Sequence, residues 1–165
     1  MAFNEANARA LILAAIKGVT NYGKAYDYER WSKKWADLRT IFMTEIGGSN
    51  LLRGWIVTLA DMNQEQETFG AAHGDKTNVV SYIYRIRGFQ ACKDSVASEK
   101  TFHALALAII AAIDADGGLH TGNYEGGASS KFVSEACVSS GFDYRMFAGI
   151  LCHFVDISKV VQETV

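Results

Sequence analysis

The stretch from Thr77 to Ile113 reads TNVVSYIYRIRGFQACKDSVASEKTFHALALAIIAAI, and it decides the fold. Apolar side chains alternate with period two in its first part, which predicts a strand over 79–87. Gly88 ends this pattern. Ser98 is a good N-cap, and Glu99 then lies in the first turn, where a carboxylate complements the helix dipole. The apolar residues of the following helix fall on one stripe, as in a helix laid across a sheet: Phe102, Leu105, Ile109, Ala112 and Ile113.

Helical spacing predicts two further helices on the N-terminal side, over 4–17 and 31–46. The segment 19–28, rich in tyrosine, suggests a short strand or strand-like arm. Residues 53–60 alternate with period two and predict a half-buried strand. The polar segment 61–78 with its two glycines then reads as a long hairpin connection, from which the strand at 79–87 returns antiparallel.

The C-terminal part begins with the glycine-rich segment 114–131, which predicts a loop. A strand is expected over 132–139, a turn beginning at 143–146, and a closing strand over 149–161. With 165 residues, the chain is expected to be one domain, 1–165. The expected fold class is α+β: an antiparallel sheet with a long helix (about 98–115) packed on one face, plus N-terminal helices.

Composition excludes several classes of function. Hydrophobic residues make up 49% and charged residues 21% of the chain, as in globular proteins. A net charge of -2 supplies no basic excess for gripping nucleic-acid phosphates. The apolar run Leu105–Ile113 is far shorter than a membrane span, so no membrane partner is expected. Three widely spaced cysteines favour buried thiols in a reducing compartment and hence cytoplasmic synthesis.

Motifs for catalysis or cofactor binding are weak. Glu99 and His103 lie four residues apart on one helical face, as acid–base partners or metal ligands sometimes do. A solvated pair is the better interpretation, because a metal site needs at least three ligands and no third is fixed nearby. The glycine loop lacks the spacing of phosphate-binding motifs, and the histidines lack that of HExxH. We therefore expect no catalytic residues, no metal and no cofactor.

Interface candidates lie in three segments. In the DYERW segment aromatic side chains are interleaved with charges, a composition that favours a protein interface over base stacking because no basic patch surrounds it. The alternative is that Tyr28 and Trp31 are core residues, with Asp27 and Arg30 paired at its edge. The alternative for the acidic residues of the 61–78 segment is a cation site, but solvated loop acids are the better interpretation. The candidate interface residues are Asp27, Tyr28, Arg30, Trp31, Asp61, Glu65, Phe69, His73, His120 and Tyr124.

Four motifs in serial order carry a family resemblance: DYERW at 27–31, RGWIVT at 53–58, YRIRGFQACKDSVASEKTF at 84–102 and FAGILCHF at 147–154. Together they resemble small tail-completion and neck proteins of long-tailed bacteriophages. Within that group, the order of elements looks most like the tail terminator. None of the motifs encodes chemistry, so their common order carries the resemblance.

The resemblance implies a virion structural protein, not an enzyme. It implies a ring, typically of six copies, that caps the tail tube and joins it to head connector proteins, with possible contact to a sheath. DNA would pass through the lumen without specific binding. The protein would be located in the neck of the virion after assembly in the host cytoplasm. The alternatives are another neck ring, a host-directed binding module, or a small intracellular enzyme using Glu99, His103 and Asp94.

Overall fold

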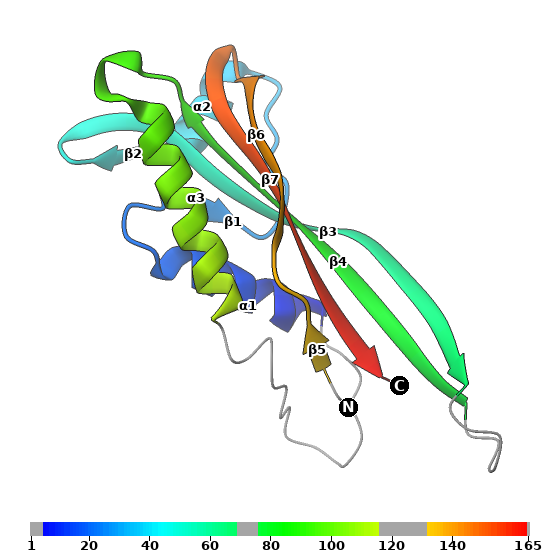
Figure 1. The fold of residues 1–165 in the computed structure, drawn as a ribbon. Coiled ribbons are helices and arrows are strands. Elements are labelled where there is room, and N and C mark those ends of the chain that lie inside the picture. The colour runs from blue at the N-terminus through cyan, green and yellow to red at the C-terminus, as the bar shows by residue number, and fades with distance from the viewer. Residues whose placement is uncertain (1–4, 69–75, 116–131, 165) are drawn as a thin grey trace.

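A computed structural model describes residues 5–68, 76–115 and 132–164 of the chain. Figure 1 shows helices and strands in one arrangement, which confirms the α+β class. The elements are α1 (Glu5–Gly18), β1 (Lys24–Tyr26), α2 (Trp35–Phe42), β2 (Met43–Ile46), β3 (Ser49–Thr68), β4 (Lys76–Ala91), the 3-10 helix η1 (Asp94–Val96), α3 (Ser98–Asp114), β5 (Phe132–Ser134), β6 (Val138–Phe147) and β7 (Ile150–Thr164).

The strands form one sheet whose main order is β1-β3-β4-β7-β5. Two further strands pair at its sides, β2 with β3 and β6 with β7. All pairings are antiparallel except that of β1 with β3, which is parallel. The expectation of an antiparallel sheet is therefore wrong at this edge, and the sheet is mixed. A parallel pair requires a crossover connection, and here the crossover contains α2 and β2.

The hairpin of β3 and β4 is much longer than expected. Pairing continues from Arg53↔Gln90 to Thr68↔Lys76, with one irregularity between Leu59 and Asp61. The interpretation of 61–78 as a connection is therefore wrong for 61–68 and 76–78. Residues 61–65 of β3 are all exposed, so neither face of the strand is buried there. The sequence of this segment therefore lacks the alternation of apolar and polar residues by which a strand is recognised. Residues 61–68 and 76–83, here called the arm, project away from the helices in Figure 1.

One face of the sheet packs against α1 and α3. Trp55 and Ile86 share a hydrophobic cluster with Ile12 of α1 and with Phe102 of α3. The Trp55 ring stacks on Phe102 with a centroid separation of 6.0 Å. A Cβ atom at Gly88 would lie 2.2 Å from the Trp55 ring, so a glycine is needed beneath the indole.

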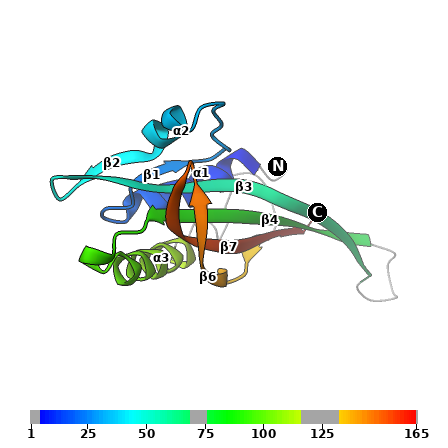
Figure 2. The same ribbon diagram turned by 90° about the horizontal axis from the view of Figure 1, so that it is seen from above.

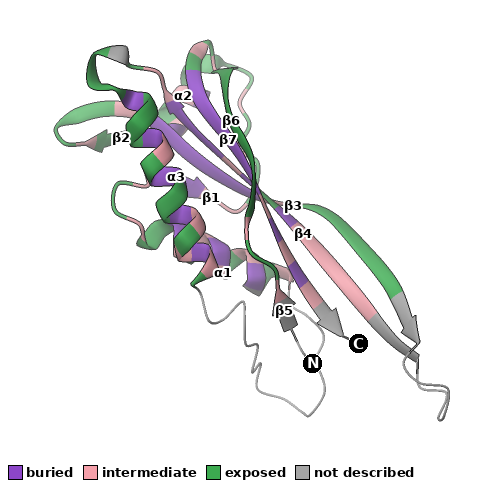
Figure 3. Cartoon of the chain, in the orientation of Figure 1, coloured by how far each residue is buried: buried purple, intermediate pink, exposed green. Residues whose placement is uncertain are grey.

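The opposite face holds a second, smaller cluster around α2. Phe42 of α2 makes edge contacts with Phe89 and Phe147, at centroid distances of 5.0 Å and 5.4 Å. Figure 2 shows α2 and α3 on opposite sides of the strands. Burial follows the same layout in Figure 3, where the middle of the sheet is buried while β6 and the outer strand of the arm are exposed. The sheet therefore separates two apolar layers, with Trp55 facing one and Ile56 the other.

Two other predictions are wrong in their bounds. The helix expected over 31–46 is limited to α2, because the backbone becomes extended at Met43 (φ -71, ψ 132) and continues as β2. Residues 143–146, expected to begin a turn, belong to β6. The side chains of β6 are exposed on both faces over most of its length, so polar and apolar residues mix without a clear period. Among the described residues, no helix is both long and apolar enough to cross a membrane.

Candidate assembly interface

The most exposed apolar surface on the sheet belongs to β6. Four large side chains of this strand are strongly exposed, Val138 (65%), Phe142 (40%), Tyr144 (54%) and Met146 (66%). One edge of β6 pairs with β7, and no described residue pairs with its other edge. An exposed strand edge that also carries large apolar groups is a ready template for another strand. The edge of β6 is therefore the leading candidate for an interface.

Packing on both faces holds β6 in place. On the α3 face, the Phe142 ring lies 3.8 Å from the His103 ring, measured between centroids. On the other face, the Arg145 guanidinium lies 4.2 Å from the centre of the Phe154 ring. Arg145 also pairs with Asp143 at 3.2 Å and with Asp156 at 3.5 Å. These contacts fix the strand while its outer edge stays open.

The predicted DYERW residues form a second exposed aromatic group. Trp31 is 83% exposed and Tyr28 49% exposed, so the alternative that places them in the core is wrong. The Arg30 guanidinium stacks over the Tyr26 and Tyr28 rings and donates to the Tyr28 hydroxyl instead of pairing with Asp27. The Asp27 backbone carbonyl accepts a hydrogen bond from Arg9 at 2.8 Å. The segment is therefore tied to α1 while its indole remains exposed.

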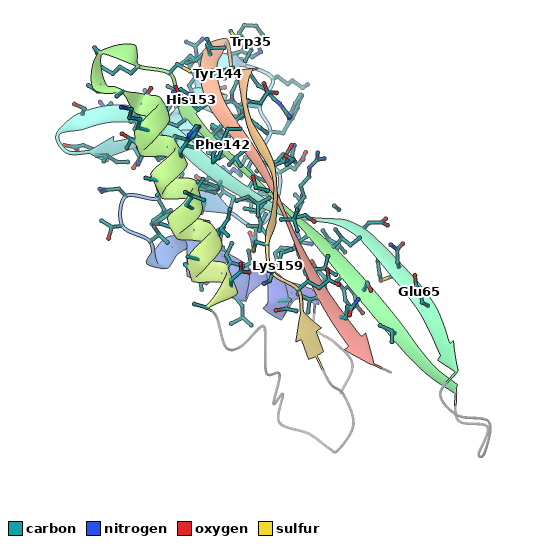
Figure 4. All side chains as sticks on the ribbon, in the orientation of Figure 1. Trp35, Glu65, Phe142, Tyr144, His153 and Lys159 are labelled. Atoms are coloured by element: carbon teal, nitrogen blue, oxygen red, sulfur yellow. The ribbon has the colours of Figure 1, made fainter. Side chains whose placement is uncertain are left out.

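The predicted acidic residues Asp61 and Glu65 lie on the arm, both exposed. The Asp61 carboxylate accepts a hydrogen bond from the Met62 N–H at 2.8 Å. Neither acid forms a salt bridge with a basic side chain that the structure describes. Figure 4 shows Glu65 on the outer strand of the arm, far from His153 and Tyr144. The other four predicted residues lie outside the described ranges: Phe69, His73, His120 and Tyr124.

A pocket of about 410 Å³ lies beside the start of α3. Its lining includes Ser98, Glu99, Tyr144 and His153. His103 is not part of this lining, so only Glu99 of the Glu99–His103 pair contributes to the pocket. The buried Ser98 hydroxyl lies 2.8 Å from His153 Nε2 and accepts a hydrogen bond from the Lys93 N–H at 2.8 Å.

The start of α3 differs from the prediction of a serine cap. Ala97 precedes the helix in the left-handed conformation (φ 47, ψ 49), and Ser98 is the first helical residue. The Ser98 side chain crosses to β7 instead of capping the helix. The sequence gives no sign of this contact, because 55 positions separate Ser98 from His153. Burial of His153 lowers the pKa of its imidazole, so the ring is neutral near pH 7 despite the nearby Glu99 carboxylate.

A buried ion pair fixes the far end of α3. Lys159 of β7 is completely buried, and its Nζ lies 2.7 Å from Asp114 Oδ1. The Asp114 carboxylate also accepts a hydrogen bond from the Cys137 N–H, at 3.0 Å and 3.2 Å to its two oxygens. Figure 4 places Lys159 near the C-terminal end of α3. This contact ties the helix to β7 and to the chain that leads into β6.

The described residues offer little for metal or thiol chemistry. No group of three or more His, Cys, Asp or Glu side chains among them lies close enough to hold a metal ion. Burial raises the pKa of the Cys137 and Cys152 thiols to about 12, so both stay protonated near neutral pH.

No family model matches this chain, and the comparison with curated proteins finds no relative.

Proposed function

We propose that this chain is a structural protein of the phage neck that assembles into a ring, in the role of a tail terminator. The observation that carries the proposal is the open edge of β6 with its exposed apolar side chains. Such an edge favours association with another strand. The arm adds a projecting element that can reach a neighbouring copy.

The positions of the four motifs behind the resemblance support the same role. RGWIVT and YRIRGF lie on β3 and β4, the two strands of the long hairpin, and DYERW contains the exposed Trp31. FAGILCHF spans the turn between β6 and β7. The motifs therefore cover the sheet and the exposed surfaces next to it. The proposed partners are further copies of this chain, the tail tube and the head connector, with DNA passing through the lumen.

Two experiments test this proposal. Electron microscopy of concentrated protein is expected to show closed rings. Immunogold labelling of intact virions is expected to place the protein at the junction of head and tail. Label found only elsewhere on the virion, or absent from it, contradicts the proposal. Label at the tube end of the neck separates a terminator from a ring that belongs to the connector.

A further inference from the structure

Two long stretches of strand edge are open among the described residues, on opposite sides of the sheet. One is the outer edge of β6. The other is the outer edge of β3 from Val57 onwards, because β2 and β1 pair with β3 only as far as Ile56. No described residue pairs with either edge. Each edge presents backbone N–H and C=O groups that can pair with another strand.

We propose that β6 of one copy pairs with the outer edge of β3, residues 57–68, of the next copy, so that the sheet continues from subunit to subunit. This inference rests on the proposed ring and specifies its interface. The contact is head-to-tail, because it joins two different surfaces. Repeated head-to-tail contacts generate a closed ring when the rotation between neighbours closes.

Strand direction is compatible with this junction. β3, β4, β7 and β6 alternate in direction across the sheet, so β6 runs opposite to β3. Rotation about a ring axis preserves the strand component along that axis. β6 and β3 of the next copy are therefore antiparallel, the direction that gives the slightly more stable pairing.

The position of the two edges along the strands predicts the tilt of the sheet. Phe142 of β6 is in register with Trp55 of β3, through Val155 and Gly88. The open part of β3 begins beyond this level, at Val57. Successive copies must therefore be staggered along the strand direction, and a sheet that closes with such a stagger has strands tilted relative to its axis.

The side chains of the two edges match on the face that carries α3. Tyr144 contacts His153 on this face of β6, and the exposed Met146 follows two positions later. On β3, Leu59 packs with the same core, and Met62 is in register with Tyr82 of that core. Met62 is 58% exposed. Pairing of the two edges covers apolar side chains of both strands.

The opposite face of the two edges brings opposite charges together. Arg145 of β6 is on this face, over Phe154, and its side chain is 48% exposed. Asp61 and Glu65 alternate with Met62 and therefore face the same way on β3. The two acids form no salt bridge with a described basic side chain. At the junction they face the exposed part of the Arg145 guanidinium, which already pairs with Asp143 and Asp156 of its own chain.

The competing arrangement is pairing of β6 with β6 of a second copy. Centred on Tyr144, it would place Asp143 against Arg145 of the other chain. That contact closes after two copies, because the same surface is used twice. It also leaves the outer edge of β3 unpaired. Only head-to-tail pairing covers both of these edges with one interface. We therefore favour pairing of β6 with β3 over pairing of β6 with β6.

The test uses two variants, each with lysines on one edge. One carries Tyr144→Lys and Met146→Lys on β6, and the other carries Met62→Lys and Gln64→Lys on β3. Lysine on an edge strand opposes pairing with another chain. A matched control is Leu107→Lys, at a 60% exposed apolar position of α3. Thermal melting first verifies that all three variants fold.

Native mass spectrometry and analytical ultracentrifugation then compare each variant with an equimolar mixture of the two edge variants. Each edge variant alone is expected to remain monomeric, whereas the mixture forms a species that contains one copy of each and nothing larger. The control assembles as the unmodified chain does. Dimers of the β3 variant alone, or a mixture that stays monomeric, overturn the inference.

The outcome is separable from that of the proposed function. If the protein forms rings and the immunogold label lies at the neck, but both edge variants still assemble, the proposed ring is right and this junction is wrong. If the mixed dimer forms but virions carry no label at the neck, the junction stands and the neck role is wrong.

Discussion

Replacing Asp114 by Asn is expected to destabilise the fold strongly, because it leaves the buried ammonium of Lys159 without its carboxylate. Lys159 is completely buried, whereas the Asp114 side chain is 28% exposed. Removing one partner of a buried ion pair costs about 3–5 kcal/mol. We expect about 3 kcal/mol, the lower end, since solvent reaches Asp114. For a chain of this size, this corresponds to a fall in melting temperature of roughly 6–12 °C.

The matched substitution is Lys159→Met, which removes the charge but keeps a long side chain in the buried position. Asp114 is then partly solvated and still accepts the hydrogen bond from the Cys137 N–H. Replacing a buried charge by an apolar group is often nearly neutral, so we expect a change within about 1 kcal/mol. The double variant should resemble Lys159→Met. Chemical denaturation of the four proteins measures these free energies of unfolding.

The dependence on pH provides a second measurement of the same pair. Burial alone would raise the pKa of the Asp114 carboxyl, but the contacts with Lys159 and Cys137 outweigh burial and lower it. The stability that comes from this shift is present above the unfolded pKa, near 4, and is lost as the pH falls through the lower folded pKa. The free energies of unfolding of the wild type and of Asp114→Asn should therefore become equal at acidic pH. A Lys159→Met variant less stable than Asp114→Asn at pH 7 would refute this account.

Other predictions concern packing and the buried histidine. Gly88→Ala should cost about 3 kcal/mol in the free energy of unfolding, because its methyl group would overlap the Trp55 ring. Gly18→Ala is the matched control, since a Cβ there meets nothing within 4 Å, and it should stabilise the protein by up to about 1 kcal/mol. Burial lowers the pKa of His153, so stability present above the unfolded value near 6.5 should be lost as the pH falls through the folded pKa. His153→Gln should flatten the melting temperature between pH 7 and 5, and an unchanged slope would contradict this assignment.

Periodic segments of the sequence predicted structure well. The alternation over 53–60 and 79–87 predicted strands that lie within β3 and β4, and α3 itself begins at Ser98 as expected. The prediction failed where side chains are exposed on both faces, as in residues 61–65 of β3 and in β6, since no burial imposes a period there. Polar composition alone then suggested a connection and a turn.

Long-range contacts were beyond prediction from the sequence. The contact of Ser98 with His153 and the pair of Asp114 with Lys159 each join residues more than 40 positions apart. Nothing local marks such partners. The exposure of Trp31 was also not predicted. Its helical spacing placed it in a helix over 31–46, whereas α2 begins only at Trp35.

The place of β4 in the sheet has a consequence for how the chain folds. β3 and β4 are joined by a hairpin and can pair early, but the other neighbour of β4 is β7, the last strand of the described chain. Pairings between such distant segments form slowly, because a large loop must close before any contact is made. Until β7 has been synthesised, the edge of β4 is unpaired, and nascent chains can pair wrongly on it. Productive folding should therefore depend on how soon β7 reaches β4.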